Sequence, residues 1–325
     1  MTDSTRAALH AARQGSIGLA YKILTDAIRS EDATAAFTLA QWRMSGDLIR
    51  RDLGEAQRLY GIAANLGLRS AEPVYLALLA TGAGDASRDW LGALDLMRRN
   101  KNPRYRRELE LISAMEIDSE GNPREKFTVE WISSKPRIGA IRDFLTPNEC
   151  EFLIEIAKPE LTESVVVSPN TGALIRDPIR TSSTATFPFV RESPALHAIN
   201  RRIAYATGTS YEQGEPAQVL AYSVGDEYKP HLDALPSADN QRALTALLYL
   251  NDTYTGGQTE FETLDWAFEA ERGDALIFAN IDDEGRPVLE ARHAGRPVIS
   301  GEKFILSKWI RERPLDLKGP GGRPF

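Results

Sequence analysis

The sequence predicts an α+β chain of two domains, with an α-helical array in the first third and a strand-rich domain with supporting helices after it. From residue 5 to about residue 117, apolar residues recur at helical spacing in an alanine-rich segment. After residue 211, short runs of β-branched and aromatic residues alternate with turn residues, as in a sandwich or jelly roll. Between them, residues 118–123 form a cluster of polar turn residues that marks the expected boundary.

Composition narrows the class of protein. A chain of 325 residues is long enough for one large or two ordinary domains, each with its own core. The charged fraction of 26% and the hydrophobic fraction of 42% are typical of soluble globular proteins. The net charge of −7 gives no general attraction for phosphate backbones, so we expect no nucleic-acid partner. The chain also has no apolar run of about 18 residues, so we expect no membrane partner.

Cysteine usage and the opening segment predict the compartment. Cys150 is the only cysteine, so no intrachain disulfide can form. The first 15 residues lack the apolar centre of a secretory signal. A reducing cytoplasm is therefore the expected location. We interpret Cys150 as a buried helix residue, because no local motif indicates a nucleophile.

The first third of the chain contains internal similarity. The segment 11–15 (Ala-Ala-Arg-Gln-Gly) recurs as 63–67 (Ala-Ala-Asn-Leu-Gly), and Ser45-Gly46 recurs 36 residues later as Thr81-Gly82. Periods in this range indicate stacked helix pairs. Residues 1–118 resemble two to three degenerate Sel-like repeats, which are relatives of tetratricopeptide repeats. Such arrays often bind a protein or peptide on a concave surface. The alternative is a cap or dimerisation arm, and the sequence does not separate these roles or indicate an oligomeric state.

The second domain, residues 119–318, opens with two short predicted strands, 127–132 and 138–141. A helix is expected next, because Thr146 and Glu149 form a capping box around Pro147 at the first helical position. A second helix is predicted over 194–207, and its His197 is interpreted as a packing or surface residue. Further strands are predicted over 217–224, 244–250, 274–279 and 304–310. The last seven residues, 319–325, are expected to be a flexible tail.

Within this domain, His231 and Asp233 stand two residues apart on a segment that reads as extended. Side chains alternate along a strand, so both point to the same face. One further imidazole would complete a 2-His-1-carboxylate triad, which suits non-haem Fe(II) and leaves coordination positions open. The chain has four histidines; His10 belongs to the helical array and His197 to a helix, so His293 is the natural third ligand.

A basic residue follows this second imidazole. Lys303 lies ten residues after His293, and the intervening Gly295, Pro297 and Gly301 can fold the chain back to bring both into one pocket. A lysine inside a barrel needs an anion as a partner. The alternative is an ordinary surface lysine.

Several ordered blocks together resemble the prolyl 4-hydroxylase branch of the Fe(II)/2-oxoglutarate dioxygenases. The resemblance covers about residues 125–313. Its motifs are Tyr222-x-x-Gly225-x-x-Tyr228-x-x-His231-x-Asp233, Gly256-Gly257-Gln258-Thr259-x-Phe261, Gly273-Asp274-Ala275-Leu276-x-Phe278, His293-Ala294-Gly295-x-Pro297-Val298-x-x-Gly301-x-Lys303 and Trp309-Ile310-Arg311.

The resemblance implies a double-stranded β-helix, which is a jelly-roll barrel, and an iron site made by His231, Asp233 and His293. It also implies that 2-oxoglutarate and O2 are used to hydroxylate a C–H bond, with release of succinate and carbon dioxide. Ascorbate would be the expected reductant. A prolyl residue in a protein or peptide, with the repeats as a possible recruiting surface, is the leading substrate.

By the same resemblance, Lys303 binds the distal carboxylate of 2-oxoglutarate, and Tyr222 and Thr259 supply hydroxyl partners. Both could instead be plain strand residues. Tyr249 lies in an apolar run and is interpreted as a core residue.

The resemblance also implies substrate contacts at Arg180, Arg242 and Glu215, with solvated charges or a salt bridge at the barrel rim as the alternative. The segment 234–241 is expected to be a mobile lip of the site or a surface loop. Gln258 stands where the family commonly has glutamate, and the 234–241 loop is short.

Two alternatives remain, and the first follows from these departures, which leave the substrate open but not the iron site. One is hydroxylation of another residue, a free amino acid or a small metabolite. The other belongs to a different class, a repeat-based binding module with a non-catalytic barrel. A nucleic-acid demethylase of the same superfamily would typically use arginine where this chain has Lys303.

Overall fold

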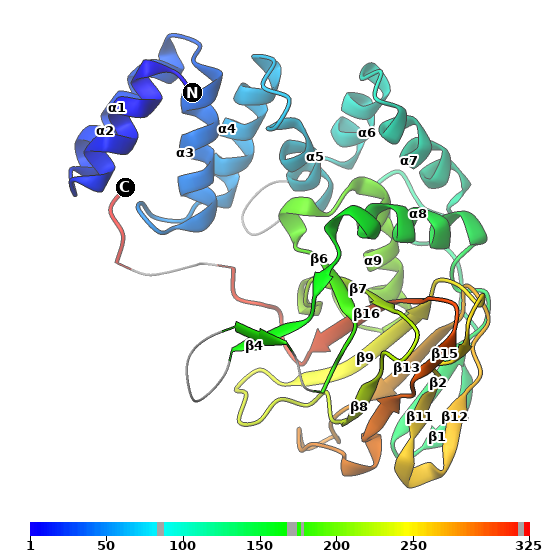
Figure 1. The fold of residues 1–325 in the computed structure, drawn as a ribbon. Coiled ribbons are helices and arrows are strands. Elements are labelled where there is room, and N and C mark those ends of the chain that lie inside the picture. The colour runs from blue at the N-terminus through cyan, green and yellow to red at the C-terminus, as the bar shows by residue number, and fades with distance from the viewer. Residues whose placement is uncertain (83–87, 168–173, 177–178, 318–321) are drawn as a thin grey trace. The chain divides into compact units, whose positions relative to one another are not determined.

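The computed structural model describes residues 1–82, 88–167, 174–176, 179–317 and 322–325, with side chains outside 165–178 (Figure 1). Its internal contacts divide the chain into two units. The first, which we call the helical unit, contains Met1–Asn122, Phe189–Ala198 and Asp316–Phe325. The second, which we call the strand unit, contains Pro123–Pro188 and Ile199–Leu315. Residues 319–321 of the predicted tail lie outside the described residues.

The helical unit is built from helices that each pack against the next along the chain (Figure 1). The helices are α1 (Asp3–Arg13), α2 (Ile17–Arg29), α3 (Ala33–Ser45), α4 (Leu53–Asn65), α5 (Glu72–Thr81), α6 (Trp90–Arg99) and α7 (Pro103–Ala114). Buried alanines such as Ala36, Ala40 and Ala63 let the helices approach closely. None of the described helices is both long and apolar enough to cross a membrane.

Local sequence explains where these helices begin and end. Asp32 and Asp52 accept hydrogen bonds from the first free backbone amides of α3 and α4. The recurring Gly46 and Gly82 end α3 and α5 with φ angles of 71° and 57°, a conformation that glycine adopts without a steric penalty.

The described end of the predicted flexible tail is packed within the helical unit. The ring of Phe325 stacks on Tyr21, with ring centroids 4.6 Å apart. The carbonyl of Pro324 accepts a 2.9 Å hydrogen bond from the Arg50 amide. A tail rich in glycine and proline has no periodic pattern that could indicate such contacts.

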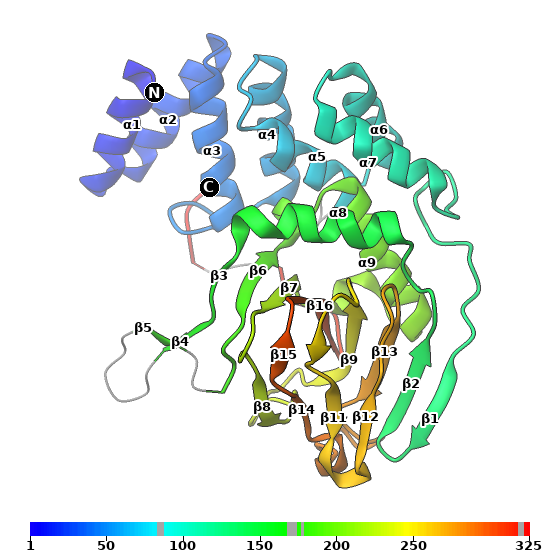
Figure 2. The same ribbon diagram turned by 45° about the vertical axis from the view of Figure 1, so that its right-hand side comes forward.

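The strand unit contains two main antiparallel sheets (Figure 2). The larger has the order β1-β2-β13-β9-β16-β7-β6-β3, and the smaller has the order β12-β11-β14-β8. The strands of these sheets are β1 (Glu130–Ser134), β2 (Arg137–Ile141), β3 (Thr162–Glu163), β6 (Ser183–Phe187), β7 (Ala217–Tyr222), β8 (Tyr228–His231), β9 (Arg242–Tyr249), β11 (Thr259–Phe261), β12 (Trp266–Phe268), β13 (Ala275–Ala279), β14 (His293–Gly295) and β16 (Lys303–Arg311).

Buried side chains from both sheets form one core, to which the larger sheet contributes Leu220, Leu247 and Leu276 and the smaller Phe261 and Phe268. The two sheets therefore enclose the interior between them. Two short pairs complete the unit, β4 (Val165–Val167) with β5 (Leu174–Arg176), and β10 (Thr255–Gly256) with β15 (Val298–Ser300).

Helix α8 (Pro147–Ala157) begins with the predicted capping box. Its Glu149 also binds Arg202 of α9 (Pro194–Thr207) through two hydrogen bonds of 2.6 and 2.9 Å, and both side chains are buried. Cys150 is fully buried, as predicted, and burial raises the pKa of its thiol to about 12. His197 is a packing residue, with Nδ1 3.0 Å from Glu192. Short 3-10 turns lie at Lys158–Glu160, Phe189–Arg191, Tyr211–Gln213, Glu262–Leu264 and Leu289–Ala291.

Most predicted strands are present with shifted ends. The expected strand 217–224 stops at Tyr222, because the Ser223 amide donates to Asp226 and starts a turn. The expected strand 127–132 begins at Glu130 and runs to Ser134.

Candidate metal centre

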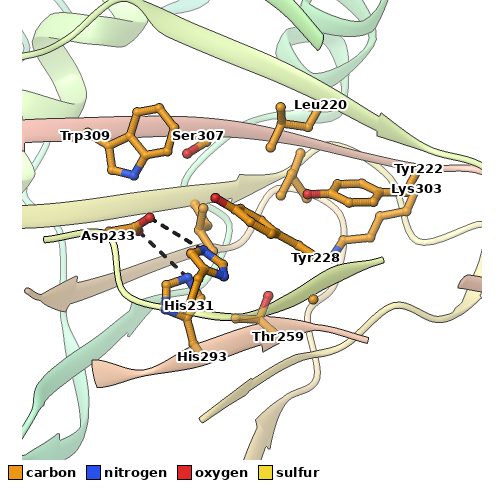
Figure 3. A pocket seen from close by; sticks show the side chains of 13 residues that line it. Leu220, Tyr222, Tyr228, His231, Asp233, Thr259, His293, Lys303, Ser307 and Trp309 are labelled. Atoms are coloured by element: carbon orange, nitrogen blue, oxygen red, sulfur yellow. Dashed lines mark ion pairs between the residues drawn. The ribbon is translucent and has the colours of Figure 1, made fainter. Parts of the chain in front are cut away.

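Three candidate ligands meet beside the smaller sheet, which carries two of them (Figure 3). His231 on β8 is the cross-strand partner of His293 on β14. Nε2 of His231 lies 3.6 Å from Oδ1 of Asp233, and Nε2 of His293 lies 3.8 Å from Oδ2. One ligand atom from each residue lies within 4.8 Å of the other two, which is the spacing expected around one metal ion. The expectation that Asp233 lies on the strand was wrong, since β8 ends at His231 and Asp233 follows it.

Both imidazoles are held in the form that binds metals. Nδ1 of His231 lies 2.8 Å from the carbonyl of Lys229, and Nδ1 of His293 lies 3.0 Å from the carbonyl of Ala291. A carbonyl only accepts, so each Nδ1 carries the hydrogen and each Nε2 presents a lone pair. Nε2 of His231 is buried and has no hydrogen-bond partner in the described part of the protein. Two neutral imidazoles and a carboxylate therefore fit the donor set of a non-haem Fe(II) site.

The electrostatics of the pocket favour the same protonation states. Burial lowers the pKa of His293 to about 4, although Asp233 opposes the shift. Burial alone would raise the pKa of the Asp233 carboxyl, but the two imidazoles and the Thr245 hydroxyl outweigh it and lower that pKa. At neutral pH the site therefore holds a carboxylate beside a neutral His293, as a divalent cation requires.

Lys303 lines the same pocket as the three ligands, as predicted (Figure 3). Its side chain is 2% exposed, and its ammonium donates a 2.6 Å hydrogen bond to the carbonyl of Gly257. Desolvation lowers the pKa of Lys303 to about 7. No described carboxylate forms an ion pair with it, so the pocket contains a buried cationic group suited to an anionic ligand.

The other predicted cofactor residues surround this lysine. Tyr222 is its cross-strand partner, and the Tyr222 ring centroid is 5.5 Å from Nζ. Thr259 also lines the pocket and accepts a 2.8 Å hydrogen bond from the hydroxyl of Tyr249. Tyr249 is a core residue, as predicted, but its ring centroid also lies 5.4 Å from Nζ of Lys303. Burial raises the pKa of Tyr222 and of Tyr249, so both hydroxyls keep their protons.

The three predicted substrate residues lie in two places. Glu215 accepts hydrogen bonds of 2.7 and 2.9 Å from Arg242 and one of 2.6 Å from Arg311. The guanidinium of Arg242 stacks 3.7 Å above the ring of Trp309, which lines the pocket. Arg180 lies elsewhere, with its guanidinium 5.6 Å from the ring centroid of Tyr228.

The predicted lip, residues 234–241, is held by hydrogen bonds at its two ends. The side chain of Gln241 bonds both the amide and the carbonyl of Leu235, at 2.6 and 2.7 Å. Asn240 exchanges hydrogen bonds with the backbone of Arg313. These bonds connect both ends of the loop and fix it to the chain that leaves β16.

Sequence reasoning assigned no role to several residues of the pocket. Tyr228 stacks on His231, with ring centroids 3.5 Å apart, and Ser307 and Trp309 also line the cavity. Tyr228 and Trp309 belong to the motifs quoted above, so the sequence could have indicated that they line the pocket. Thr245, which bonds Asp233, lies in an apolar run with no distinguishing motif.

The donor set and the strand unit together define a class, the non-haem iron oxygenases that use a keto-acid cosubstrate. A family model described as the 2OG-Fe(II) oxygenase superfamily matches residues 217–311, which include all three candidate ligands and Lys303.

Curated relatives make the assignment narrower. Prolyl 4-hydroxylase 1 of Arabidopsis thaliana is 35% identical over 234 residues, a match that covers 66% of this chain and 82% of the relative. The α-1 subunit of prolyl 4-hydroxylase from Gallus gallus is 34% identical over 230 residues, covering 68% of this chain and 41% of the subunit. The chain belongs to the prolyl 4-hydroxylase family of 2OG-Fe(II) oxygenases.

Solved structures include a similar protein. The viral collagen prolyl hydroxylase of Paramecium bursaria Chlorella virus-1, in its 2-oxoglutarate complex, is 28% identical with a TM-score of 0.43, covering 54% of this chain and 95% of that one.

Proposed function

We propose that this protein hydroxylates a prolyl residue in a protein or peptide and couples the reaction to decarboxylation of 2-oxoglutarate to succinate. The observation that carries the proposal is one pocket lined by two imidazoles, a carboxylate and a buried lysine. Membership of the prolyl 4-hydroxylase family supports the reaction and the substrate class.

In this proposal His231, Asp233 and His293 hold Fe(II). The bound iron, together with 2-oxoglutarate and O2, supplies the oxidant for the C–H bond. The residues of the chain orient the reactants and exclude water. The carbonyls of Lys229 and Ala291 fix the two rings, so no rearrangement is needed when the ion binds.

Lys303 is proposed to bind the distal carboxylate of 2-oxoglutarate through a charge-assisted hydrogen bond, with hydroxyl contacts from Tyr222 and Thr259. Because the lysine is buried, its interaction with an anion is stronger than it would be in water. The anion in turn raises the pKa of Lys303 and keeps it protonated.

The substrate is proposed to lie at the mouth of the pocket, beside Arg180 and the cluster of Glu215, Arg242 and Trp309. A planar guanidinium presents several donors to the carbonyl groups of an extended peptide. The helical unit is proposed to be a Sel-like repeat array that recruits the peptide substrate. The order of the two sheets supports a double-stranded β-helix as the finer description of the strand unit. We further propose ascorbate as the reductant and the cytoplasm as the location.

The proposal is tested with proline-containing peptides. We expect them to stimulate succinate formation by the Fe(II)-loaded protein, and mass spectrometry to find a gain of about 16 Da, one oxygen atom, on a proline. Stimulation by a small metabolite alone would exclude the prolyl substrate. Host proteins compared with and without this enzyme would then identify the natural target.

A further inference from the structure

A chain of buried polar side chains lies behind the candidate ligand Asp233. The hydroxyl of Thr245 is 2.6 Å from Oδ2 of Asp233, and Nδ2 of Asn280 is 2.9 Å from the same hydroxyl oxygen. Thr245 is fully buried, Asn280 is 2% exposed and Asp233 is 4% exposed. Thr245 belongs to β9, and Asn280 directly follows β13. This chain of hydrogen bonds therefore runs from the larger sheet to Asp233, which follows β8 of the smaller sheet.

The direction of these hydrogen bonds follows from the chemistry of the groups. A hydroxyl has one hydrogen to donate, and a carboxylate can only accept. The amide of Asn280 donates to the oxygen of Thr245, so the Thr245 hydrogen points at Asp233. A hydrogen bond from a hydroxyl to a carboxylate is also shorter and stronger than one between neutral groups. The Thr245 hydrogen therefore takes one lone pair of Oδ2, so Oδ1, which lies 3.6 Å from Nε2 of His231, keeps more acceptor capacity for a metal.

We propose that Thr245, oriented by Asn280, is a positioning residue that restricts Asp233 to one metal-binding oxygen. This inference rests on the proposed function. Fe(II) that carries three protein ligands has coordination positions left for a keto acid and O2. A carboxylate with both oxygens free can bind a cation through both, and it would then occupy one of those positions. Thr245 thus protects the binding position of the cosubstrate without touching it.

The test uses the full-length chain loaded with Co(II), whose visible spectrum reports coordination number and geometry. In Thr245→Val the hydroxyl is replaced by a methyl group of similar size. We expect its Co(II) spectrum to change and the affinity of the Co(II)-loaded protein for 2-oxoglutarate to fall about 10- to 100-fold. Thr245→Ser retains the hydroxyl, and we expect it to restore the spectrum and most of the affinity. Both readouts are independent of any prolyl substrate.

A matched control is available in the helical unit. Thr38 is also buried, and its hydroxyl donates a 2.8 Å hydrogen bond to the carbonyl of Thr34. We expect Thr38→Val to remove a buried hydroxyl without changing the Co(II) spectrum or the cosubstrate affinity.

A second variant tests the direction of the hydrogen bonds and serves if Thr245→Val does not fold. In Asn280→Asp an acceptor replaces the amide donor, so the Thr245 hydrogen turns away from Asp233. We expect the same spectral change as in Thr245→Val, although Thr245 is intact. Asn280→Ser keeps a hydroxyl donor at this position, and we expect a smaller change.

The outcomes separate this inference from the proposed function. If the wild-type protein binds Co(II) and 2-oxoglutarate, and Thr245→Val or Asn280→Asp leaves spectrum and affinity unchanged, the positioning role is excluded and the proposed function stands. A wild-type protein that binds neither would exclude both. A changed spectrum and weakened cosubstrate binding, restored by Thr245→Ser, support the inference.

Discussion

Nζ of Lys303 donates a 2.6 Å hydrogen bond to the carbonyl of Gly257, and no described carboxylate forms an ion pair with it. Burial of the ammonium therefore costs the folded protein free energy whenever the lysine is protonated. The low pKa of Lys303, about 7 against the ordinary value of 10.5, expresses that cost.

This relationship predicts a pH dependence of stability for the metal-free protein. Below pH 7 both the folded and the unfolded chain carry the proton, so stability does not change through this group. Between pH 7 and 10.5 only the unfolded chain carries it, so the free energy of unfolding rises with pH. At about 1.4 kcal/mol per pH unit, we expect a gain of about 2–3 kcal/mol from pH 7 to 9. Urea titrations at both pH values measure it.

Lys303→Met is the matched comparison for that prediction. It removes the titrating group and keeps a long apolar side chain, so the gain between pH 7 and 9 should disappear. Parallel stability profiles for Lys303→Met and the wild type would contradict the assignment of the effect to Lys303.

The second prediction concerns the metal ligands. We expect the protein with Fe(II) and 2-oxoglutarate, kept without O2, to show a weak visible charge-transfer band. Asp233→Ala removes the one carboxylate among the candidate ligands in the described part of the protein, so the band should be absent. Asp239→Ala, which changes an exposed side chain of the 234–241 loop, is the control and should keep the band. The enzyme assignment fails if the wild type itself shows no band under saturating conditions.

The third prediction concerns the cluster at the rim of the pocket. Glu215 accepts hydrogen bonds from both Arg242 and Arg311, and all three side chains are less than one-fifth exposed. In Glu215→Gln the two guanidinium groups lose their shared anion, so we expect the free energy of unfolding to fall by about 1–3 kcal/mol. Glu302→Gln on the exposed surface is the control. Equal urea midpoints for the two variants would show that the cluster does not support the rim.

The fourth prediction concerns the scaffold. Glu149 caps α8 and forms a buried double hydrogen bond with Arg202. Glu149→Gln leaves the guanidinium buried without its anion, so we expect a loss of about 3–5 kcal/mol in the free energy of unfolding. Glu151, on the same helix but more than half exposed, forms a loose 3.7 Å pair with Arg272. Glu151→Gln should therefore cost less than about 1 kcal/mol. Similar losses for both would contradict the importance of burial.

The main features of the fold were predictable because they depend on local patterns. The helical spacing in the first third, the capping box at Thr146 and the strand-rich pattern after residue 211 each reflect short-range chemistry. Strand ends were less accurate, because they depend on single turns such as the bond from the Ser223 amide to Asp226. The packed end of the tail depends on a stack between Tyr21 and Phe325, which are far apart in the sequence.

The candidate site also has a part that was predictable from local sequence and a part that was not. His231 and Asp233 were recognisable from their spacing together with the ordered motifs around them, and His293 from the scarcity of histidines. The network behind them was not, because Thr245 reaches Asp233 from β9 of the other sheet, and Asn280, which directly follows β13, contacts Thr245. The residues around Thr245 are those of an ordinary buried strand, and those after Asn280 are those of an ordinary turn. Only the three-dimensional pairing of the sheets brings them together.

The pairing of His231 with His293 across β8 and β14 has a consequence for folding. A slip of one residue between these strands would turn one imidazole to the opposite face, so a bound cation is compatible with a single register. A bound cation therefore stabilises only the correct alignment of these two strands. By linkage, the free energy with which the ion prefers the aligned sheet equals the stability that it adds to that sheet. Strand assembly and catalytic competence are thus coupled through the same pair of rings.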